Sequence, residues 1–290
     1  MNILIIGNPI ASGGDGEKRI RELQCILENR GHVVETYLTQ YAGDGKNRIS
    51  QVTSAVDRMV IVGGDGTVNE IINGLPHGFS TPILQVPTGN ANLLAHDLHL
   101  PQAAPKVADI LEKGRVVMAD VAKMNTTAFI MVAGAGFDAR VTEEVKKIRR
   151  GKLSNLTYVL PIFRALRNPA HSLFDVVVDG TKRARGAMVL VCNVRNFGGI
   201  CEIAFDAGVD TGELDIVVFP RINLLSILKY GIFSKLSRVT RLKGVKYLKG
   251  KTVDIDSKTP IPVELDGDFN GWHSHVTIQL KAGRVPLLVP

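Results

Sequence analysis

The sequence predicts an N-terminal α/β domain with a parallel, Rossmann-like sheet, followed by a second domain of mainly antiparallel β structure. Two observations lead to this fold class. Up to Val116, short apolar runs rich in β-branched residues alternate with helical patterns, as in βαβ units. After Val116, short apolar or alternating runs recur with turn residues between them, which is typical of antiparallel strands. We place the boundary near residue 120, which gives domains 1–120 and 121–290 and leaves open whether the last residues return to the first domain.

In the first domain, the helix expected at 17–29 ends before Gly31 and carries Ile20, Leu23 and Leu27 on one face. The strands expected here are Ile3–Ile6, Val33–Leu38, Met59–Val62 and Ile83–Val86. Ligands of parallel sheets bind at the carboxyl ends of the strands. The sequence therefore predicts one site built from the loops at Asn8–Gly14, at Thr39, at Gly63–Thr67 and after Val86.

In the second domain, the expected strands are Phe129–Val132, Phe174–Val178, Ala187–Cys192, Leu214–Phe219, Val253–Ile255, Val263–Leu265 and Val276–Leu280.

Composition narrows the class of protein. An apolar fraction of 45% and a charged fraction of 22% are those of an ordinary globular protein. Three cysteines without metal-ligand spacing favour a reducing cytoplasm. No apolar stretch approaches the roughly 18 residues of a membrane span, and the first residues form a strand in place of a signal peptide. The net charge of +7 favours an anionic partner, but 6% aromatics without a basic–aromatic motif argue against nucleic acid.

The glycine loop after the third strand is the most informative motif. Gly63-Gly64-Asp65-Gly66 leaves backbone N–H groups uncovered, and Thr67 with Glu70 forms the capping-box pattern of a helix start. N–H groups at a helix N-terminus bind phosphate, whereas the Asp65 carboxylate would repel phosphate unless a divalent cation lay between them. The loop therefore predicts a nucleotide and metal site. The alternative is a tight turn that needs glycines for its geometry alone.

The longer run Gly-Gly-Asp-Gly-Thr-Val-Asn-Glu at 63–70 resembles the diacylglycerol kinase catalytic family, which includes bacterial lipid kinases and sphingosine and ceramide kinases. The more distant NAD kinases share its first five residues. This resemblance implies an α/β nucleotide domain, a β-sandwich that binds the lipid substrate, ATP as phosphoryl donor and Mg²⁺. Matching segments extend from Asn8 to Asp268.

Two further segments resemble the family's nucleotide loops. One is Asn8-Pro9-x-x-Ser12-Gly13, and the other is Pro87-Thr88-Gly89-Asn90-Ala91-Asn92, in which Asn90 stands where a hydroxyl residue is usual. The alternative for Asn90 and Asn92 is that they only cap a turn. The residues expected to contact nucleotide are Asn8, Pro9, Ser12, Thr39, Gly63, Gly64, Asp65, Gly66, Thr67, Glu70, Gly89, Asn90 and Asn92.

Three carboxylates are expected to take part in catalysis. Asp65 would bind magnesium, and the resemblance implies that Asp120 belongs to the same network of metal and water. From the residues alone, an acid in an apolar run such as Asp120 is typical of a satisfied structural residue. Asp268 matches the family's general-base Glu with an arm one methylene shorter; alone, Asp266-Gly267 would be a plain β-turn. Asp210 is a third metal candidate, because Thr211 replaces the family's metal-binding Asp.

A basic segment suggests where a lipid would be met. Residues 216–253 contain nine Lys or Arg and no acid, and Leu225, Leu228, Ile232, Leu236 and Val239 recur there at helical spacing. Such a helix can lie on an anionic bilayer, with a second basic run at 146–152 adding to it. The alternative is a helix that covers the β domain with a solvated basic face.

The sequence thus predicts a cytoplasmic, peripherally membrane-associated lipid kinase that phosphorylates a lipid hydroxyl, with diacylglycerol as default acceptor. Sphingoid, ceramide and other lipids stay open as acceptors, as does a homodimer. The rival functions are an NAD kinase and a non-catalytic nucleotide- or lipid-binding protein.

Overall fold

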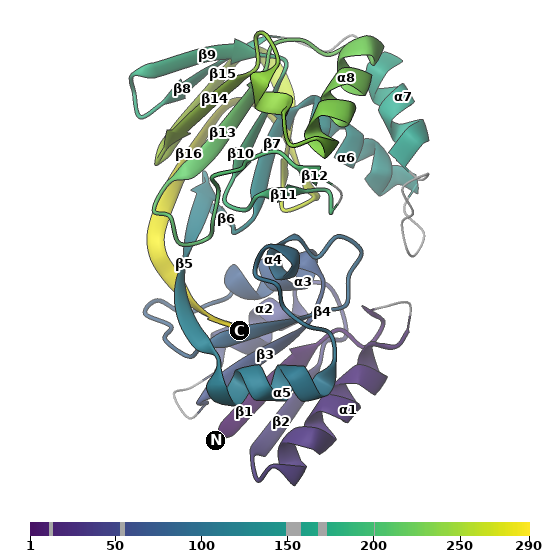
Figure 1. The fold of residues 1–290 in the computed structure, drawn as a ribbon, viewed down its shortest axis with the longest axis vertical. Coiled ribbons are helices and arrows are strands. Elements are labelled where there is room, and N and C mark those ends of the chain that lie inside the picture. The colour runs from purple at the N-terminus through teal and green to yellow at the C-terminus, as the bar shows by residue number, and fades with distance from the viewer. Residues whose placement is uncertain (12–13, 53–55, 149–157, 168–172, 200) are drawn as a thin grey trace. The chain divides into compact units, whose positions relative to one another are not determined.

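The computed structural model describes residues 1–11, 14–52, 56–148, 158–167, 173–199 and 201–290. The chain forms two compact units (Figure 1): unit 1 is Met1–Val121 with Ala282–Pro290, and unit 2 is Ala122–Lys281. The predicted fold class is confirmed, because unit 1 has a parallel sheet with helices and unit 2 is an antiparallel β-sandwich. None of the helices in the described ranges has the length and apolarity needed to cross a bilayer.

The parallel sheet of unit 1 follows the predicted strands closely. Its order is β2–β1–β3–β4, and the strands are β1 (Asn2–Gly7), β2 (Val33–Leu38), β3 (Arg58–Gly63) and β4 (Ile83–Pro87). The end of β16 (Asp268–Val289) joins next to β4, where Leu287 pairs with Ile83 in parallel. The last residues of the chain therefore return to the first unit.

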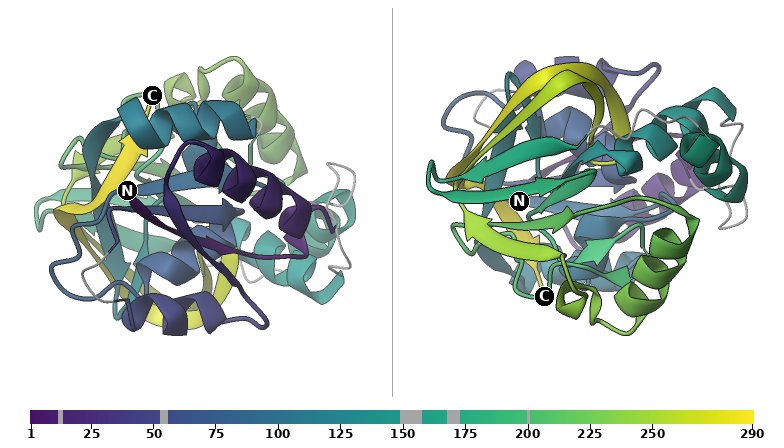
Figure 2. Two further views of the ribbon diagram at one scale, coloured as in Figure 1. Left: turned by 90° about the horizontal axis from the view of Figure 1, so that it is seen from below. Right: turned by 90° about the horizontal axis from the view of Figure 1, so that it is seen from above.

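Helices cover both faces of this sheet, as the left view of Figure 2 shows. Figure 1 places α1 (Gly16–Asn29) and α5 (Ala104–Lys113) on one face, and α2 (Asp44–Ser50) and α3 (Asp65–Ile72) on the other. The short α4 (Leu93–Asp97) follows β4. Ile20, Leu23 and Leu27 of α1 are buried in a core with alternate residues of the strands, as the helical pattern predicted.

The sandwich of unit 2 is built around one long strand, β15 (Thr252–Leu265). Its first half pairs with β8 through Val253–Asp256, and its last residues pair with β7 through Val263–Leu265. Register irregularities between these halves let the strand change direction. The other strands are β5 (Arg115–Met124), β6 (Thr127–Phe129), β7 (Val132–Gly136), β8 (Phe174–Val178), β9 (Lys182–Gly186), β10 (Met188–Cys192), β11 (Asn196–Phe197), β12 (Cys201–Glu202), β13 (Leu214–Phe219) and β14 (Lys246–Gly250).

Three of the strands predicted in this unit need correction. The run Phe129–Val132 is divided between β6 and β7, because the backbone bends at Ile130 and Met131, whose N–H groups donate to the Asp266 carboxylate. The runs at Val253 and Val263, predicted as separate strands, are both part of β15.

In the described part of unit 2 the helices are α6 (Phe137–Ile148), α7 (Val159–Arg167) and α8 (Leu224–Lys235), and α6 packs on β7 and β15. Phe137, Val141 and Val145 of α6 form a cluster with Ala165 of α7, and Ile227 of α8 packs against it. The helical pattern predicted through Val239 is too long. The helix ends at Lys235, and Val239 is buried in a separate 3-10 turn, Val239–Arg241.

Candidate functional site

The loops after the first four strands meet at one edge of the unit 1 sheet. Backbone hydrogen bonds connect them: the Asn8 N–H donates to the Val62 carbonyl at 3.1 Å, and the Thr39 N–H to the Gly7 carbonyl at 2.9 Å. The Gly63 carbonyl accepts from the Thr88 N–H at 3.3 Å. The structure therefore gathers the four predicted loops, because parallel strands end on the same side.

The glycine loop starts its helix earlier than the capping pattern predicted. Helix α3 begins at Asp65 with Gly64 as N-cap and no side-chain cap, so the Thr67–Glu70 capping box is wrong. A Cβ atom on Gly63 would lie 2.4 Å from the Thr67 Cβ, so Gly63 makes room for Thr67. The Glu70 carboxylate accepts from the Lys46 N–H of α2 at 3.2 Å. Glycine at N-cap allowed the helix to begin without help from Thr67.

Two glycines hold the third and fourth loops in direct backbone contact. A Cβ on Gly64 would lie 2.8 Å from the Gly89 Cα, and a Cβ on Gly89 would lie 2.7 Å from the Gly64 Cα. The Asn92 side chain closes the second loop, because it accepts from the Gly89 N–H at 2.8 Å and donates to the Gly89 carbonyl at 2.9 Å. Asn92 thus forms a turn, the alternative left open for it, while Asn90 is exposed at the tip.

The first loop has a defined turn at its start. The Asn8 side-chain oxygen accepts from the Ile10 N–H at 3.0 Å, and the Pro9 carbonyl accepts from the Glu17 N–H at 3.3 Å. Ser12, the third residue predicted in this loop, lies outside the described residues.

Asp65 is the first residue of α3, where its carboxylate meets the positive end of the helix dipole. The Gly66 N–H lies in the first turn of α3, where no preceding helical turn supplies an acceptor, and suits a phosphate oxygen. Mg²⁺ in nucleotide sites is held by one or two carboxylates, with phosphates and water completing an oxygen shell. No group of three or more His, Cys, Asp or Glu in the described part of the chain could hold a metal. Asp65 therefore fits a magnesium ion that arrives with a nucleotide.

Asp120 has a structural partner. It is 2% exposed in β5, and its carboxylate accepts from the Gly283 N–H at 2.7 Å. This bond ties β5 to the part of β16 that belongs to unit 1. This hydrogen bond explains how an acid can be buried in an apolar strand. It agrees with the alternative interpretation of Asp120 as a satisfied structural residue.

Asp268 begins β16 directly after a tight turn. Leu265 pairs with Asp268 across it, and Asp266 and Gly267 have φ of 49° and 85°, as a type I′ turn requires. The buried Asp266 carboxylate accepts from the N–H groups of Ile130, Met131 and Val132 at 2.9 to 3.1 Å. The turn is therefore anchored in the sandwich while Asp268 itself is exposed.

The sequence analysis missed two acids beside this turn, the buried Glu264 and the half-buried Asp138. The Glu264 carboxylate accepts from the Gly267 N–H at 2.8 Å and is hydrogen bonded to Asp138 of α6. Burial raises the pKa of Glu264 well above its usual value, with the neighbouring Asp138 adding to the effect. Burial likewise raises the pKa of Asp138 to about 7. An acid within the apolar run of a strand, at Glu264, was the available signal, but its pairing with Asp138 depends on the tertiary fold.

Asp210 is exposed, and the segment around it is held by a cation of the chain itself. Thr211 donates its hydroxyl to the Gly208 and Glu213 carbonyls, which closes a local turn. The Lys249 ammonium lies 3.0 Å from Asp206 and 3.9 Å from Asp215. Lys249 therefore balances the negative charge of this segment.

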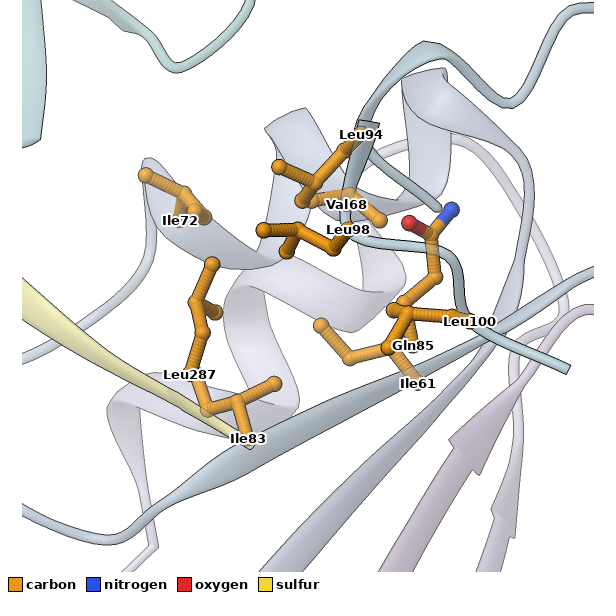
Figure 3. A pocket seen from close by; sticks show the side chains of 9 residues that line it. All are labelled: Ile61, Val68, Ile72, Ile83, Gln85, Leu94, Leu98, Leu100 and Leu287. Carbon is orange, nitrogen blue, oxygen red and sulfur yellow. The ribbon is translucent and has the colours of Figure 1, made fainter. Parts of the chain in front are cut away.

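A small apolar cavity lies beneath the glycine loop (Figure 3). Its volume is about 10 Å³, and its lining includes Ile61 of β3, Val68 of α3, and Leu94 of α4. Gln85 faces this cavity and donates from Nε2 to the Gly63 carbonyl at 3.4 Å. The cavity is too small for a nucleotide, so Gln85 supports the loop from within the core.

Comparison with known proteins agrees with this geometry. A family model described as the diacylglycerol kinase catalytic domain matches residues 2–124. A second, described as the YegS C-terminal NAD kinase beta sandwich-like domain, matches residues 131–288. A diacylglycerol kinase of Bacillus subtilis is 26% identical over 272 residues, which cover 92% of this chain and 89% of the relative. A diacylglycerol kinase of Staphylococcus saprophyticus is 25% identical over 272 residues, with 92% and 88% covered.

Solved structures show the same two-part fold. A crystal structure of a diacylglycerol kinase from Bacillus anthracis has a TM-score of 0.80 and 26% identity, covering all of this chain and 97% of that one. An NAD kinase from Archaeoglobus fulgidus, solved in complex with ATP, has a TM-score of 0.55 and 16% identity, covering 99% and 93%. The similarity to the NAD kinase shows a shared fold alone.

Proposed function

The chain belongs to the diacylglycerol kinase family, and from this premise we propose that it transfers the γ-phosphate of ATP to a lipid hydroxyl, with diacylglycerol as the acceptor. The observation that carries the proposal is the contact of Gly64 with Gly89 beside Asp65. It brings two loops together without side chains between them, so that backbone N–H groups and one carboxylate border the same edge of the sheet. These are the groups that phosphates and a magnesium ion require.

In this proposal each named residue has one task. The loops that contain Asn8, Thr39, Gly64 and Gly89 bind and orient the nucleotide. Asp65 would hold Mg²⁺, and Asp120 would be the second carboxylate that organises magnesium and water. The bound ion would supply charge neutralisation on the phosphates. Asp268 accepts the proton of the lipid hydroxyl, because a carboxylate within hydrogen-bond reach serves as a general base.

The decisive experiment uses γ-labelled ATP with magnesium, a panel of lipid acceptors, and NAD. Labelled diacylglycerol is the expected product, and Asp268→Asn is expected to reduce its formation by about 100-fold or more. Asp175→Asn, which changes an exposed acid of β8, is the matched control and should leave the rate unchanged. Label in NAD alone would establish the NAD kinase alternative. ATP binding without any labelled product would establish a binding protein.

We also propose that α8 docks on the anionic cytoplasmic face of the membrane, where the lipid acceptor lies. The support is the side-chain exposure along α8 and its C-cap, where polar residues are buried and apolar residues face solvent. Ser226 and Ser234 are buried, whereas Leu225, Leu228, Ile232 and Leu236 are 56% to 77% exposed. These four apolar residues recur every three or four positions and so form one stripe. By helical geometry the exposed Lys229 and Lys235 flank it on either side.

An anionic bilayer suits this stripe better than a second copy of the chain. A symmetric dimer through α8 would set the lysines of the two copies against each other. In a bilayer the leucines enter the acyl boundary while the lysine ammonium groups reach lipid phosphates. The segment 216–253, which includes α8, carries nine basic residues and no acid, so its charge is complementary to that of an anionic membrane surface.

Vesicle sedimentation tests this surface. Wild-type protein should bind phosphatidylcholine vesicles that contain phosphatidylglycerol, and Leu225→Glu combined with Ile232→Glu should reduce binding about 10-fold or more. Val33→Glu, which changes an exposed apolar residue of β2, is the control and should bind like the wild type. Equal binding by all three proteins, or a dimer that dissociates only in the α8 variant, would contradict the membrane assignment.

A further inference from the structure

We propose that Glu264 is a positioning residue for Asp268, and that it acts as a pair with Asp138. The inference rests on the proposed role of Asp268 as the base. It concerns how an exposed side chain at the tip of a hairpin is held at one place. A base displaced by about 1 Å can lose about 100-fold in rate, so its backbone has to be fixed.

The turn that carries Asp268 is held at two points. The Asp266 carboxylate fixes it to the bend between β6 and β7 through the N–H groups of Ile130, Met131 and Val132. Asn193 supports that bend, because its side-chain amide donates to the Ile130 carbonyl at 2.8 Å. These contacts fix the first turn residue.

The second turn residue depends on Glu264. The Gly267 N–H donates to Glu264 Oε2 at 2.8 Å, and Gly267 is the residue directly before Asp268. Gly267 has a φ of 85°, and a Cβ built on it would meet no atom within 4 Å, so side-chain packing would not hold this residue. The hydrogen bond from Glu264 is therefore the contact that orients the peptide leading into Asp268.

Glu264 is in turn oriented by Asp138. A Cβ on Gly134 would lie 2.7 Å from Asp138 Oδ2 and 2.7 Å from Glu264 Oε1, so these two oxygens flank the bare backbone of β7. Glu264 Oε1 thus faces the Asp138 carboxyl group while Oε2 serves Gly267. Any side chain at position 134 would force the two acids apart.

Two facing carboxyl groups, one of them buried, favour a proton held between them, because two negative charges so close repel each other. Burial raises the pKa of Asp138 to about 7 and that of Glu264 well above its usual value. The other titratable groups that act on the pair are Asp266 and Asp268 of the hairpin and the buried thiol of Cys192 in β10. Ionisation of the second carboxyl group would weaken the pair, so the position of the turn becomes sensitive to pH.

The test compares Glu264→Ala with Glu264→Gln. The alanine variant loses the acceptor for Gly267 and is expected to lower kcat about 100-fold while the KM for ATP changes less than about 2-fold. Glutamine can accept from Gly267 and donate to Asp138, so it should restore kcat to within about 3-fold and flatten its pH profile. Glu202→Gln, an exposed acid of β12, is the matched control. A glutamine variant as slow as the alanine variant, or an alanine variant as fast as the wild type, overturns the proposal.

A second measurement does not depend on kinase activity. The ¹⁵N–¹H signals of Gly267 and Asp268 should move with pH in the wild type, and the shift should be absent in Glu264→Gln. Gly134→Ala should displace the same two signals, because its methyl group separates the acids. If these signals are unaffected by either substitution, Glu264 does not position the turn. If the wild type phosphorylates no acceptor, the kinase proposal fails while this measurement still decides the positioning of Asp268.

Discussion

Gly64 and Gly89 pack backbone against backbone, because a Cβ on either would come within 2.8 Å of the other's Cα. This contact joins the loop after β3 to the loop after β4 at the edge where the nucleotide is proposed to bind. The two residues belong to different sequence motifs, and neither motif by itself explains why glycine is needed at both.

The first prediction concerns this contact. Gly89→Ala should lower the free energy of unfolding by about 1–3 kcal/mol, because the added methyl group overpacks a backbone contact. It should also weaken ATP binding, since the two loops move apart. Urea denaturation and ATP titration measure the two effects. Gly231→Ala in α8, where no atom lies within 4 Å, is the control and should gain up to about 1 kcal/mol. A Gly89→Ala protein as stable as the wild type would show that the loops adjust freely.

The second prediction uses the tetrapeptide Gly-Gly-Asp-Gly, which occurs in the sequence at 13–16 as well as at 63–66. Asp65→Asn should reduce phosphoryl transfer about 100-fold or more, because a neutral side chain at the start of α3 holds magnesium poorly. Asp15→Asn should leave the rate unchanged, because Asp15 is exposed before α1. Steady-state rates at several magnesium concentrations test both. Equal losses in the two variants would refute a special role for Asp65.

The third prediction separates the two roles open to Asp120. Asp120→Ala removes the buried carboxylate that accepts from the Gly283 N–H and should lower the free energy of unfolding by about 1–3 kcal/mol. Asp120→Asn keeps an oxygen acceptor, so it should cost less than about 1.5 kcal/mol and yet lower activity at least about 10-fold if Asp120 serves magnesium. Full activity of the asparagine variant would leave Asp120 with its structural role alone.

The fourth prediction follows from the acid pair. Both acids have a raised pKa in the folded protein, so the folded state keeps protons that the unfolded chain releases near pH 4. The stability they contribute is therefore present at low pH and lost as pH rises toward about 7, the pKa of Asp138. Asp138→Asn should remove the part of this pH-dependent loss of stability that comes from Asp138. The free energy of unfolding of the variant, relative to the wild type, should rise by on the order of 1 kcal/mol between pH 5 and pH 8 in denaturant titrations. If the difference in free energy of unfolding between the variant and the wild type stayed constant from pH 5 to pH 8, the raised pKa of Asp138 would be contradicted.

Local patterns were sufficient for much of the fold. Strands at Val33–Leu38 and Leu214–Phe219 begin and end where the sequence predicted, because half of the residues of each are β-branched and glycine lies shortly before each. The local patterns failed where a residue far away in the chain binds the backbone. At Ile130 and Met131 the N–H groups donate to the Asp266 carboxylate, and the predicted strand is interrupted there. The capping pattern at Thr67 failed for a nearer reason, because the N-cap is Gly64, three residues before Thr67, and glycine there let the helix begin at Asp65.

By itself the sequence determined the order of the two units, the glycine loop and the family, since each is encoded in contiguous residues whose chemistry is local. The tertiary structure alone decided which face of α8 is covered, because periodicity gives the spacing of Leu225 and Ile232 but not the side on which the core lies. It also decided that Gly64 meets Gly89 and that Asp138 meets Glu264. Those contacts join residues far apart in the chain, and they form only when the sheets bring separate strands together.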